Sequence, residues 1–123
     1  MSVTFRPCVL IPCYNHGAMM ASVLARLAPF DLPCLVVDDG SDETTRRTLE
    51  ALAADRPQMT LLRLAENSGK GAAVMLGLKA CADRGFTHAV QVDADGQHAI
   101  EDIPKLLALA GRHPDALISG QPV

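Results

Sequence analysis

Residues 34–54 read CLVVDDGSDETTRRTLEALAA, and this stretch contains the pattern that decides the fold. Four apolar residues at Cys34–Val37 are followed by an acidic turn and then by an amphipathic stretch over Glu43–Ala54. A short continuous apolar run is typical of a strand buried on both faces. Ser41 or Asp42 can cap the helix that follows. The stretch therefore predicts one β-strand followed by one α-helix.

The same alternation continues along the whole chain. Further strands are predicted at Cys8–Ile11, Thr60–Leu64, Ala89–Val92 and Ala116–Ile118, and further helices at Ala18–Ala28, Gly71–Asp83 and Asp102–Gly111. Alternating strands and helices predict right-handed crossovers and a mostly parallel α/β sheet with helices on both faces. Gly85 and Gly111 are predicted to stop the third and fourth helices.

Composition limits the class of protein. The 123 residues are 49% hydrophobic and 20% charged, with a net charge of −3, which is typical of one folded domain. The chain has no run of Lys or Arg, so a nucleic-acid partner is disfavoured. The four cysteines contain no C-x-x-C pair, and we expect buried thiols in a reducing cytosol. Neither a membrane-spanning run nor a signal peptide is recognisable, which favours a cytoplasmic location.

Polar, glycine-rich segments follow the first four predicted strands. These segments are Pro12–Gly17, Asp38–Asp42, Glu66–Gly71 and Asp93–His98. In open α/β sheets, ligands bind at the carboxyl ends of the strands. We therefore expect the four segments to converge on one ligand site.

The segment after the fourth strand is suited to a metal ion. Asp93 and Asp95 are spaced i, i+2 after a Val-rich strand, and Gln97 adds a neutral oxygen two residues further on. Such oxygen ligands suit Mg²⁺ or Mn²⁺, which are often held by one or two carboxylates together with substrate phosphate. A lone D-x-D is more often a solvated acidic turn, so the prediction depends on the three other segments beside it.

The other segments contain side chains suited to a nucleotide. Asp38 can accept a hydrogen bond from a base or a ribose while Ser41 or Asp42 caps the next helix. Tyr14, the only tyrosine, can stack on a base or simply pack against the protein. Ser68–Gly71 is not a P-loop, because Leu64 and Gly71 replace its first glycine and its Ser or Thr. Its glycines allow a ligand to approach the backbone closely, with Lys70 near a base or phosphate.

Taken together, these segments resemble the family-2 glycosyltransferases, inverting enzymes of the GT-A fold with a Rossmann-like nucleotide-sugar-binding half. The resemblance covers nearly the whole chain, through Ile11–Asn15, Val36–Thr44, Asn67–Ala73 and Asp93–His98. Lys70–Ala73 and Asp93–His98 are most similar to the polyprenol-phosphate branch, which includes enzymes like dolichol-phosphate mannose synthase. His16 stands where the family has an acidic residue, so no contact is carried over to that position.

The resemblance implies roles for individual residues. Pro12, Tyr14 and Asp38 would line the base and ribose pocket, near Lys70, and Asp93 would lie near the sugar or ribose. The full set of substrate-binding candidates is Pro12, Tyr14, Asn15, Asp38, Asp39, Lys70, Asp93 and Ala94. Asp93, Asp95 and Gln97 would hold the Mg²⁺ or Mn²⁺ ion that bridges the diphosphate. The general base for a hydroxyl acceptor is expected beyond Val123.

The resemblance also implies an activity. A sugar would be transferred with inversion from a UDP- or GDP-linked donor to a polyprenyl phosphate or a glycan. Residues 1–123 would then be the N-terminal, donor-binding part of the enzyme, able to bind the donor but with little transfer activity alone. We expect attachment to the cytoplasmic face of a membrane through segments outside this chain. The edge strand near Ala116–Ser119 would lack a neighbour, so self-association through this edge is a further expectation.

Two other classes of protein fit part of the pattern. A metal-dependent nucleotidyltransferase has a related core, but it usually carries a basic, Gly-rich loop after the first strand. Pro12–Gly17 contains neither Lys nor Arg. A non-catalytic module, such as a nucleotide-binding or receiver-like domain, could use Asp38 and Asp39 as its acidic pocket. A receiver also needs an Asp at the end of its third strand, where Leu64–Glu66 stands.

Overall fold

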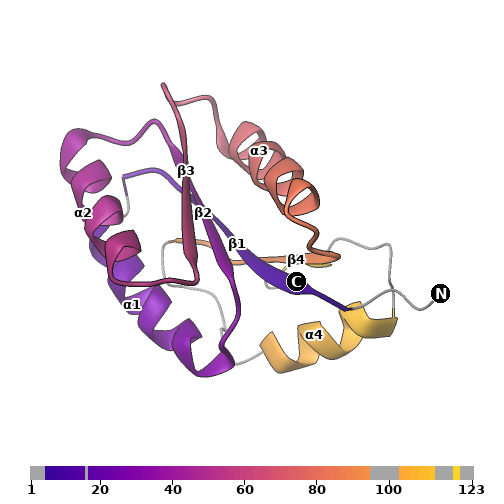
Figure 1. The fold of residues 1–123 in the computed structure, drawn as a ribbon. Coiled ribbons are helices and arrows are strands. Elements are labelled where there is room, and N and C mark those ends of the chain that lie inside the picture. The colour runs from indigo at the N-terminus through magenta and orange to yellow at the C-terminus, as the bar shows by residue number, and fades with distance from the viewer. Residues whose placement is uncertain (1–4, 16, 95–102, 113–117, 120–123) are drawn as a thin grey trace.

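The computed structural model describes residues 5–15, 17–94, 103–112 and 118–119. In these ranges the chain forms a five-stranded sheet in the order β3-β2-β1-β4-β5 (Figure 1). The strands are β1 (Pro7–Cys13), β2 (Cys34–Asp39), β3 (Met59–Leu64), β4 (His88–Gln91) and β5 (Ile118–Ser119). All the described strand pairs are parallel, which confirms the predicted parallel α/β sheet.

The described helices are α1 (Gly17–Leu27), α2 (Glu43–Ala54), α3 (Lys70–Asp83) and α4 (Ile103–Arg112). A short 3₁₀ turn, η1 (Ala28–Phe30), follows α1 and was not predicted. Its Pro29 cannot continue the hydrogen-bond ladder of α1. Gly85, with φ +81°, follows α3 as predicted. The predicted stop at Gly111 is wrong, because α4 continues to Arg112. A glycine in the last helical turn costs only about 1 kcal/mol, which is too little to end the helix there.

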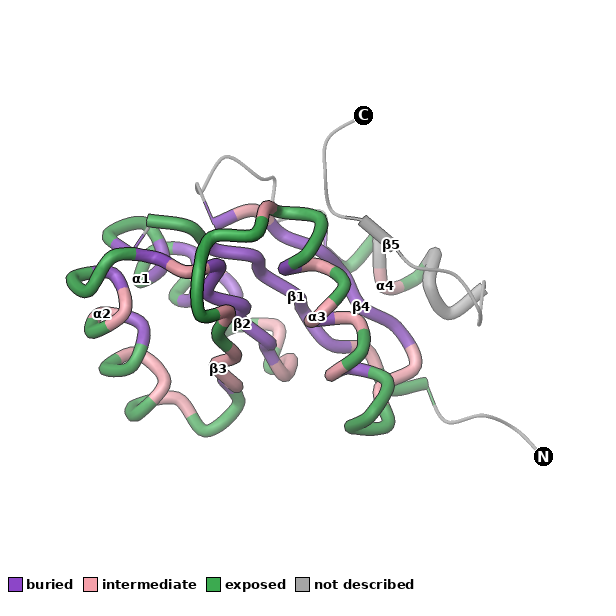
Figure 2. Tube along the Cα trace, turned by 90° about the horizontal axis from the view of Figure 1, so that it is seen from above, coloured by how far each residue is buried: buried purple, intermediate pink, exposed green. Residues whose placement is uncertain are grey.

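The helices cover the sheet in two layers. α1, α2 and α4 lie on one face, and α3 lies on the other (Figure 1). Successive residues of β1 alternate between these layers, with Val9 and Ile11 in the first core and Cys8 and Leu10 beneath α3. The predicted inward side of α1 is confirmed, because Met20, Val23, Leu24 and Leu27 are all buried. Figure 2 shows β1, β2 and β4 buried, whereas the edge strand β3 is only partly buried and the outer sides of the helices are exposed.

The strand order reverses next to β1. The chain runs from β1 outward through β2 to β3, then crosses by way of α3 to β4 on the other side of β1. In open α/β sheets, the crevice at the carboxyl ends of the strands at such a reversal is the usual ligand site. The ends of β1 and β4 are therefore the positions at which a site is expected.

Asp42 is the residue that caps α2. Its Oδ1 accepts a hydrogen bond of 2.8 Å from the Thr45 amide, whereas the Ser41 hydroxyl oxygen accepts one from the Asn15 amide. Of the two predicted caps, Asp42 is therefore the one observed. The hydrogen bonds from Thr45 lower the pKa of Asp42.

Replacing Asp42 with alanine is expected to lower the Tm at neutral pH by a few degrees, because the Thr45 amide loses its partner. The folded-state pKa of Asp42 lies below its unfolded value, so its carboxylate stabilises the protein above the unfolded pKa. That stabilisation is lost as the pH falls through the folded pKa. Thermal melts from pH 7 downward should show the difference from wild type shrinking in acid. Asp55→Ala, at the other end of α2, is the matched control and should not lower the Tm.

β3 and β5 are the edges of the described sheet. Of the strand predicted at Ala116–Ile118, the structure describes Ile118, and residues 113–117 lie outside the described residues. Self-association through this edge stays a prediction. None of the helices in the described ranges has both the length and the apolar character needed to cross a bilayer.

Candidate functional site

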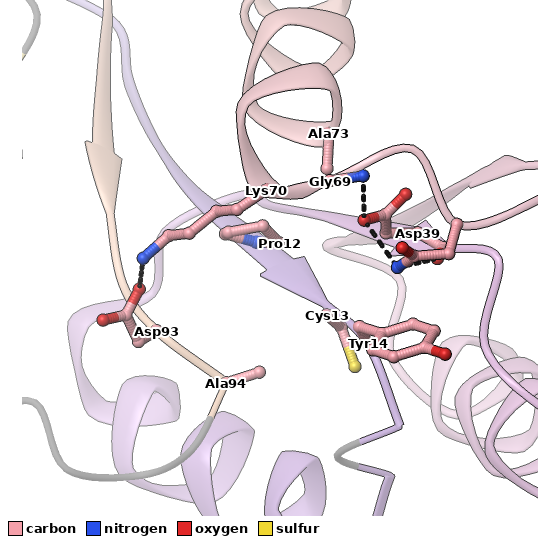
Figure 3. A pocket seen from close by; sticks show the side chains of 10 residues that line it. Pro12, Cys13, Tyr14, Asp39, Gly69, Lys70, Ala73, Asp93 and Ala94 are labelled. Carbon is pink, nitrogen blue, oxygen red and sulfur yellow. Dashed lines mark hydrogen bonds and ion pairs between the residues drawn. The ribbon is translucent and has the colours of Figure 1, made fainter.

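A cavity of about 310 Å³ lies at the carboxyl ends of β1, β2 and β4, beside the start of α3 (Figure 3). This volume is at the lower end of the range for small-molecule pockets, about 300–1,000 Å³. All four polar segments contribute to the cavity. Its lining consists of Pro12, Cys13, Tyr14, Asp39, Asn67, Gly69, Lys70, Ala73, Asp93 and Ala94.

Asp39 holds the loop that leads into α3. Its side chain is buried, with 3% of the residue exposed, and Oδ1 accepts a hydrogen bond of 2.8 Å from the Ser68 amide. Oδ2 accepts bonds of 3.0 Å from the Gly69 amide and 3.1 Å from Asn67 Nδ2. Hydrogen bonds to an ionised acceptor are the stronger ones in proteins. Asp39 therefore fixes residues 66–69, called here the α3 loop, at the wall of the cavity.

Gly40 allows the α3 loop to lie against the end of β2. Its φ of +67° is in the left-handed region, which favours glycine. A Cβ at this position would lie 2.3 Å from the amide nitrogen of Asn67 and 2.3 Å from the carbonyl carbon of Glu66. No ordinary side chain fits in that space. Asp39 and Gly40 thus act together, one by binding the loop and the other by making room for it.

Lys70 and Asp93 form an ion pair across the cavity. The Lys70 side chain extends from the start of α3 past Pro12, and its Nζ lies 2.8 Å from Asp93 Oδ1 (Figure 3). The Lys70 side chain is 50% exposed and that of Asp93 is 26% exposed. Solvent-exposed pairs of this kind are worth only about 0–1 kcal/mol, so an anion or a cation can replace either partner at little cost.

Asp38 and Asn15 lie outside the cavity lining. The Asp38 side chain is buried, its Oδ1 accepts from the Ser41 amide at 2.9 Å, and its Oδ2 lies 3.7 Å from Arg63 Nη1. Asn15 Oδ1 accepts from the Asp42 amide at 2.9 Å, which ties the loop after β1 to the loop after β2. The contacts described for Asp38 and for Asn15 are therefore with other residues of this chain. The predicted donor contacts of these two residues stay predictions.

The extent of β2 explains the different positions of Asp38 and Asp39. The sequence placed both in the turn after the strand, but the structure shows them as the last two residues of β2. Side chains alternate across a strand. Asp38 therefore shares the face of Val36, beneath α1 and α2, whereas Asp39 points toward α3 and the cavity.

One of the three predicted metal ligands can be placed. Asp93 lines the cavity, while Asp95 and Gln97 lie outside the described residues. Within the described ranges, no cluster of three or more His, Cys, Asp or Glu side chains could hold a metal ion. Mg²⁺ is often held in proteins by one or two carboxylates together with substrate phosphate, and Asp93 supplies one such carboxylate to the cavity.

The structure adds four lining residues that were not among the predicted site residues. They are Cys13, Asn67, Gly69 and Ala73. Ala73 could have been found from the sequence, because a residue three positions after Lys70 lies on the same side of a helix. Asn67 and Gly69 belong to one of the segments on which the family resemblance rests. Cys13 likewise belongs to the segment that follows the first predicted strand, which sets it apart from the other buried cysteines.

Comparison with known proteins agrees with this geometry. The family model described as "Glycosyl transferase family 2" matches residues 8–123. An undecaprenyl-phosphate mannosyltransferase of Micrococcus luteus is 34% identical over 120 residues, which cover 96% of this chain and 49% of that protein. A polyprenol monophosphomannose synthase of Mycolicibacterium smegmatis is 33% identical over 121 residues, covering 96% and 46%. The chain thus spans about half the length of these curated relatives.

A solved structure shows the same fold. The mannosyltransferase PcManGT from Pyrobaculum calidifontis, solved in complex with GDP-Man and Mn²⁺, superposes with a TM-score of 0.59 at 24% identity. The match covers 76% of this chain and 29% of that one. The fold, the polar segments at the strand ends and the family match lead to the same assignment. The chain belongs to glycosyl transferase family 2, and its relatives confirm the resemblance to the polyprenol-phosphate sugar synthase branch.

Proposed function

We propose that residues 1–123 form the donor-binding part of an inverting glycosyltransferase that transfers a sugar from a UDP- or GDP-linked donor to a polyprenyl phosphate. The observation that carries the proposal is the cavity at the strand reversal, where Lys70, Asp93 and the start of α3 meet. The names of the relatives, which specify undecaprenyl-phosphate and polyprenol substrates, support the lipid phosphate over a glycan. Such an acceptor would place the whole enzyme at the cytoplasmic face of a membrane.

The cavity offers separate places for the two ends of a nucleotide. Tyr14, which is 45% exposed, and Pro12 present an apolar surface on which a base can stack. At the other end, α3 begins after Gly69, which has no side chain of its own to cap the first turn. The positive end of this helix dipole and the Lys70 ammonium together favour a diphosphate. Asp39 contributes by holding the α3 loop rather than by contacting the base.

A divalent cation fits the diphosphate end of the cavity. We propose that Asp93, together with Asp95 and Gln97, holds Mg²⁺ or Mn²⁺, and the Mn²⁺ in the PcManGT complex supports this. When bound, the ion would neutralise the charge that develops on the leaving nucleoside diphosphate. Lys70 would leave Asp93 and bind a phosphate oxygen instead. Its ammonium group would then act on the diphosphate together with the metal ion.

The described carboxylates of the cavity are poorly suited to act as a general base. Asp39 is hydrogen-bonded to the α3 loop, and Asp93 is paired with Lys70. In an inverting transfer, the acceptor oxygen attacks the anomeric carbon from the face opposite the diphosphate. A phosphate acceptor is already ionised and needs little help from a base. A polyprenyl phosphate acceptor would therefore require no base from the described residues of this cavity, and we expect little transfer by the chain alone.

Donor binding should be visible as a metal-dependent rise in Tm. A ligand at about 100 times its Kd stabilises a protein by about 2.7 kcal/mol, which corresponds to several degrees. The ligands to compare are UDP, GDP, UDP-glucose, GDP-mannose and ATP, each with and without Mn²⁺. We expect the shift with UDP or GDP compounds and expect Asp95→Ala to abolish its dependence on metal.

A matched pair of lysine variants on α3 locates the binding site. Lys70→Ala should weaken donor binding about tenfold, because a hydrogen bond to a charged group is worth about 1.5–3 kcal/mol. Lys79→Ala removes an exposed lysine of the same helix outside the cavity lining and should leave the affinity unchanged. In the Tm comparison above, a rise with ATP but with none of the UDP or GDP compounds would favour the nucleotidyltransferase alternative. Equal effects of the two variants would mean that the donor does not bind in this cavity.

A further inference from the structure

Two buried thiols meet between the sheet and α3. The sulfur atoms of Cys8 in β1 and Cys81 in α3 lie 3.0 Å apart, although the residues are 73 positions apart in the chain. Cys8 is 0% exposed and Cys81 is 4% exposed. The S–S bond of a disulfide is about 2.05 Å long. The two sulfur atoms therefore need to approach by only about 1 Å to reach bonding distance.

The packing of α3 on β1 holds these thiols together. Gly77 lies one turn before Cys81 on α3, and Leu10 lies two residues after Cys8 on β1, on the same face of the sheet. A Cβ on Gly77 would lie only 2.2 Å from Leu10 Cδ1. Because Gly77 has no side chain, α3 can approach β1 closely where Gly77 meets Leu10, next to the contact between Cys81 and Cys8. The backbones of α3 and β1 are therefore close together one helical turn from the contact between the two sulfur atoms.

The remaining two cysteines lie elsewhere. Cys13 and Cys34 belong to the core on the opposite face of the sheet, beneath α1, α2 and α4. The Cys34 thiol donates to the Leu32 carbonyl oxygen at 3.5 Å. Four cysteines allow three possible disulfide connectivities. The layered fold favours a bond between Cys8 and Cys81.

The two thiols differ in acidity. The hydrogen bond with Cys81 and burial raise the pKa of Cys8. The same hydrogen bond, together with the nearby Arg84, lowers the pKa of Cys81. The thiolate is the reactive form of cysteine. Cys81 also keeps 4% of its surface exposed whereas Cys8 has none, so an oxidant reaches Cys81 first and Cys8 is the sulfur that resolves the product.

We propose that Cys8 and Cys81 form an oxidation site at which hydrogen peroxide converts the thiol pair into an intramolecular disulfide. The Cys81 thiolate attacks one peroxide oxygen, the O–O bond breaks, and the released hydroxide takes up one proton and leaves as water. The Cys8 sulfur then gives up its proton and attacks the Cys81 sulfenic acid. The S–S bond forms as the S–O bond breaks, and a second water leaves. Two thiols are oxidised, one peroxide is reduced to two waters, and a dithiol reductant reverses the change.

The disulfide would join the two walls of the cavity described above. β1 contributes Pro12 and Cys13 to the lining, and α3 contributes Lys70 and Ala73. A covalent bond between this strand and this helix would hold the two walls together. Because the thiols are buried, oxidation must wait for α3 to move away from β1 and should be slower than oxidation of an exposed thiol.

Hydrogen peroxide applied to the purified chain tests this inference directly, and it does not depend on the proposed glycosyltransferase activity. After alkylation of the remaining thiols, peptide mapping without reductant should find one cross-linked pair that contains Cys8 and Cys81. The intact chain should lose two hydrogens in mass. Its Tm should rise by about 10 °C and return to the starting value with dithiothreitol.

Alanine variants supply matched controls. Cys8→Ala and Cys81→Ala should each abolish both the cross-link and the rise in Tm. Cys13→Ala and Cys34→Ala, which remove a buried thiol from the other face, should retain both. A cross-link that involves Cys13 or Cys34, a bond between two chains, or oxidation of Cys81 to sulfinic acid without a cross-link would overturn the inference. Peptide mapping of the oxidised wild-type chain shows whether Cys8 and Cys81 are cross-linked even if a variant does not fold.

Discussion

Replacing Gly40 with alanine is expected to lower the free energy of unfolding by more than about 3 kcal/mol. Two costs add at this position. The φ of +67° costs a residue with a Cβ about 1–2 kcal/mol. The new Cβ would also lie 2.3 Å from backbone atoms of Glu66 and Asn67, and backbone atoms cannot turn away as a side chain can. The α3 loop would have to leave the end of β2. Urea unfolding followed by circular dichroism measures the loss.

Two other glycines separate these costs. Gly69 has a φ of +100°, but a Cβ there would meet nothing within 4 Å, so Gly69→Ala carries the conformational cost alone. Its ψ of 156° places it in a region that is essentially restricted to glycine, so we expect it to lose about 1–3 kcal/mol. A Cβ on Gly71 would also meet nothing within 4 Å, and its φ is not positive, so Gly71→Ala should gain up to about 1 kcal/mol of helix propensity. If Gly40→Ala cost no more than Gly69→Ala, the contact with the α3 loop would not matter to stability.

The second large effect is expected for Asp39→Asn. The variant keeps the shape of the side chain but turns one of two accepting oxygens into a donating NH₂. The Ser68 amide donates to one oxygen, and the Gly69 amide and Asn67 Nδ2 donate to the other. Whichever way the new amide turns, a donor faces a donor. A buried donor without a partner costs about 1–3 kcal/mol, and the charge of the acceptor is lost as well. We expect a loss of about 3 kcal/mol in urea unfolding.

Hydrogen exchange locates the change in the Asp39→Asn variant. In the wild-type chain the amides of Ser68 and Gly69 are bonded to Asp39 and should exchange slowly. At least one of them should exchange much faster in the variant, while the amides of β1 remain protected. Asp83→Asn makes the same change on an exposed side chain at the end of α3 and should be close to neutral. Unchanged exchange at both Ser68 and Gly69 would show that Asp39 does not hold the loop.

The predictable part of the fold lies in short-range patterns. Residues 34–37 are continuously apolar and are buried in β2, and the periodic apolar residues of α1 form its buried side. These patterns follow from the geometry of one strand or one helix, so they can be read without knowing what packs against them. The predicted positions of the elements hold to within a few residues. The boundaries are less certain, because the end of an element depends on its neighbours, as at Gly111 and Pro29.

The candidate site could be predicted in part for the same reason. Lys70, Asp93 and Tyr14 each lie in a polar segment that follows a predicted strand, which makes them site candidates, and all three line the cavity. The sequence assigns the base or ribose contact to Asp38, whereas Asp39 is the one that lines the cavity, because the direction of each side chain depends on where β2 ends. That end is set by pairing with β1 and β3, in which Asp38 lies beside Cys13 and Arg63. Long-range hydrogen bonding between strands does not leave a local signature.

The sequence by itself determined the parallel α/β sheet, the polar segments at its carboxyl edge and the family to which the chain belongs. Each of these depends on residue type and spacing within short segments and on the order of those segments along the chain. The tertiary structure alone decided that Asp39 holds the α3 loop, that Lys70 pairs with Asp93 and that Cys8 meets Cys81. These partners are 23 to 73 positions apart in the chain. The crossing of α3 over the sheet brings them together, and no periodicity within a segment encodes which side chains meet across such a crossing.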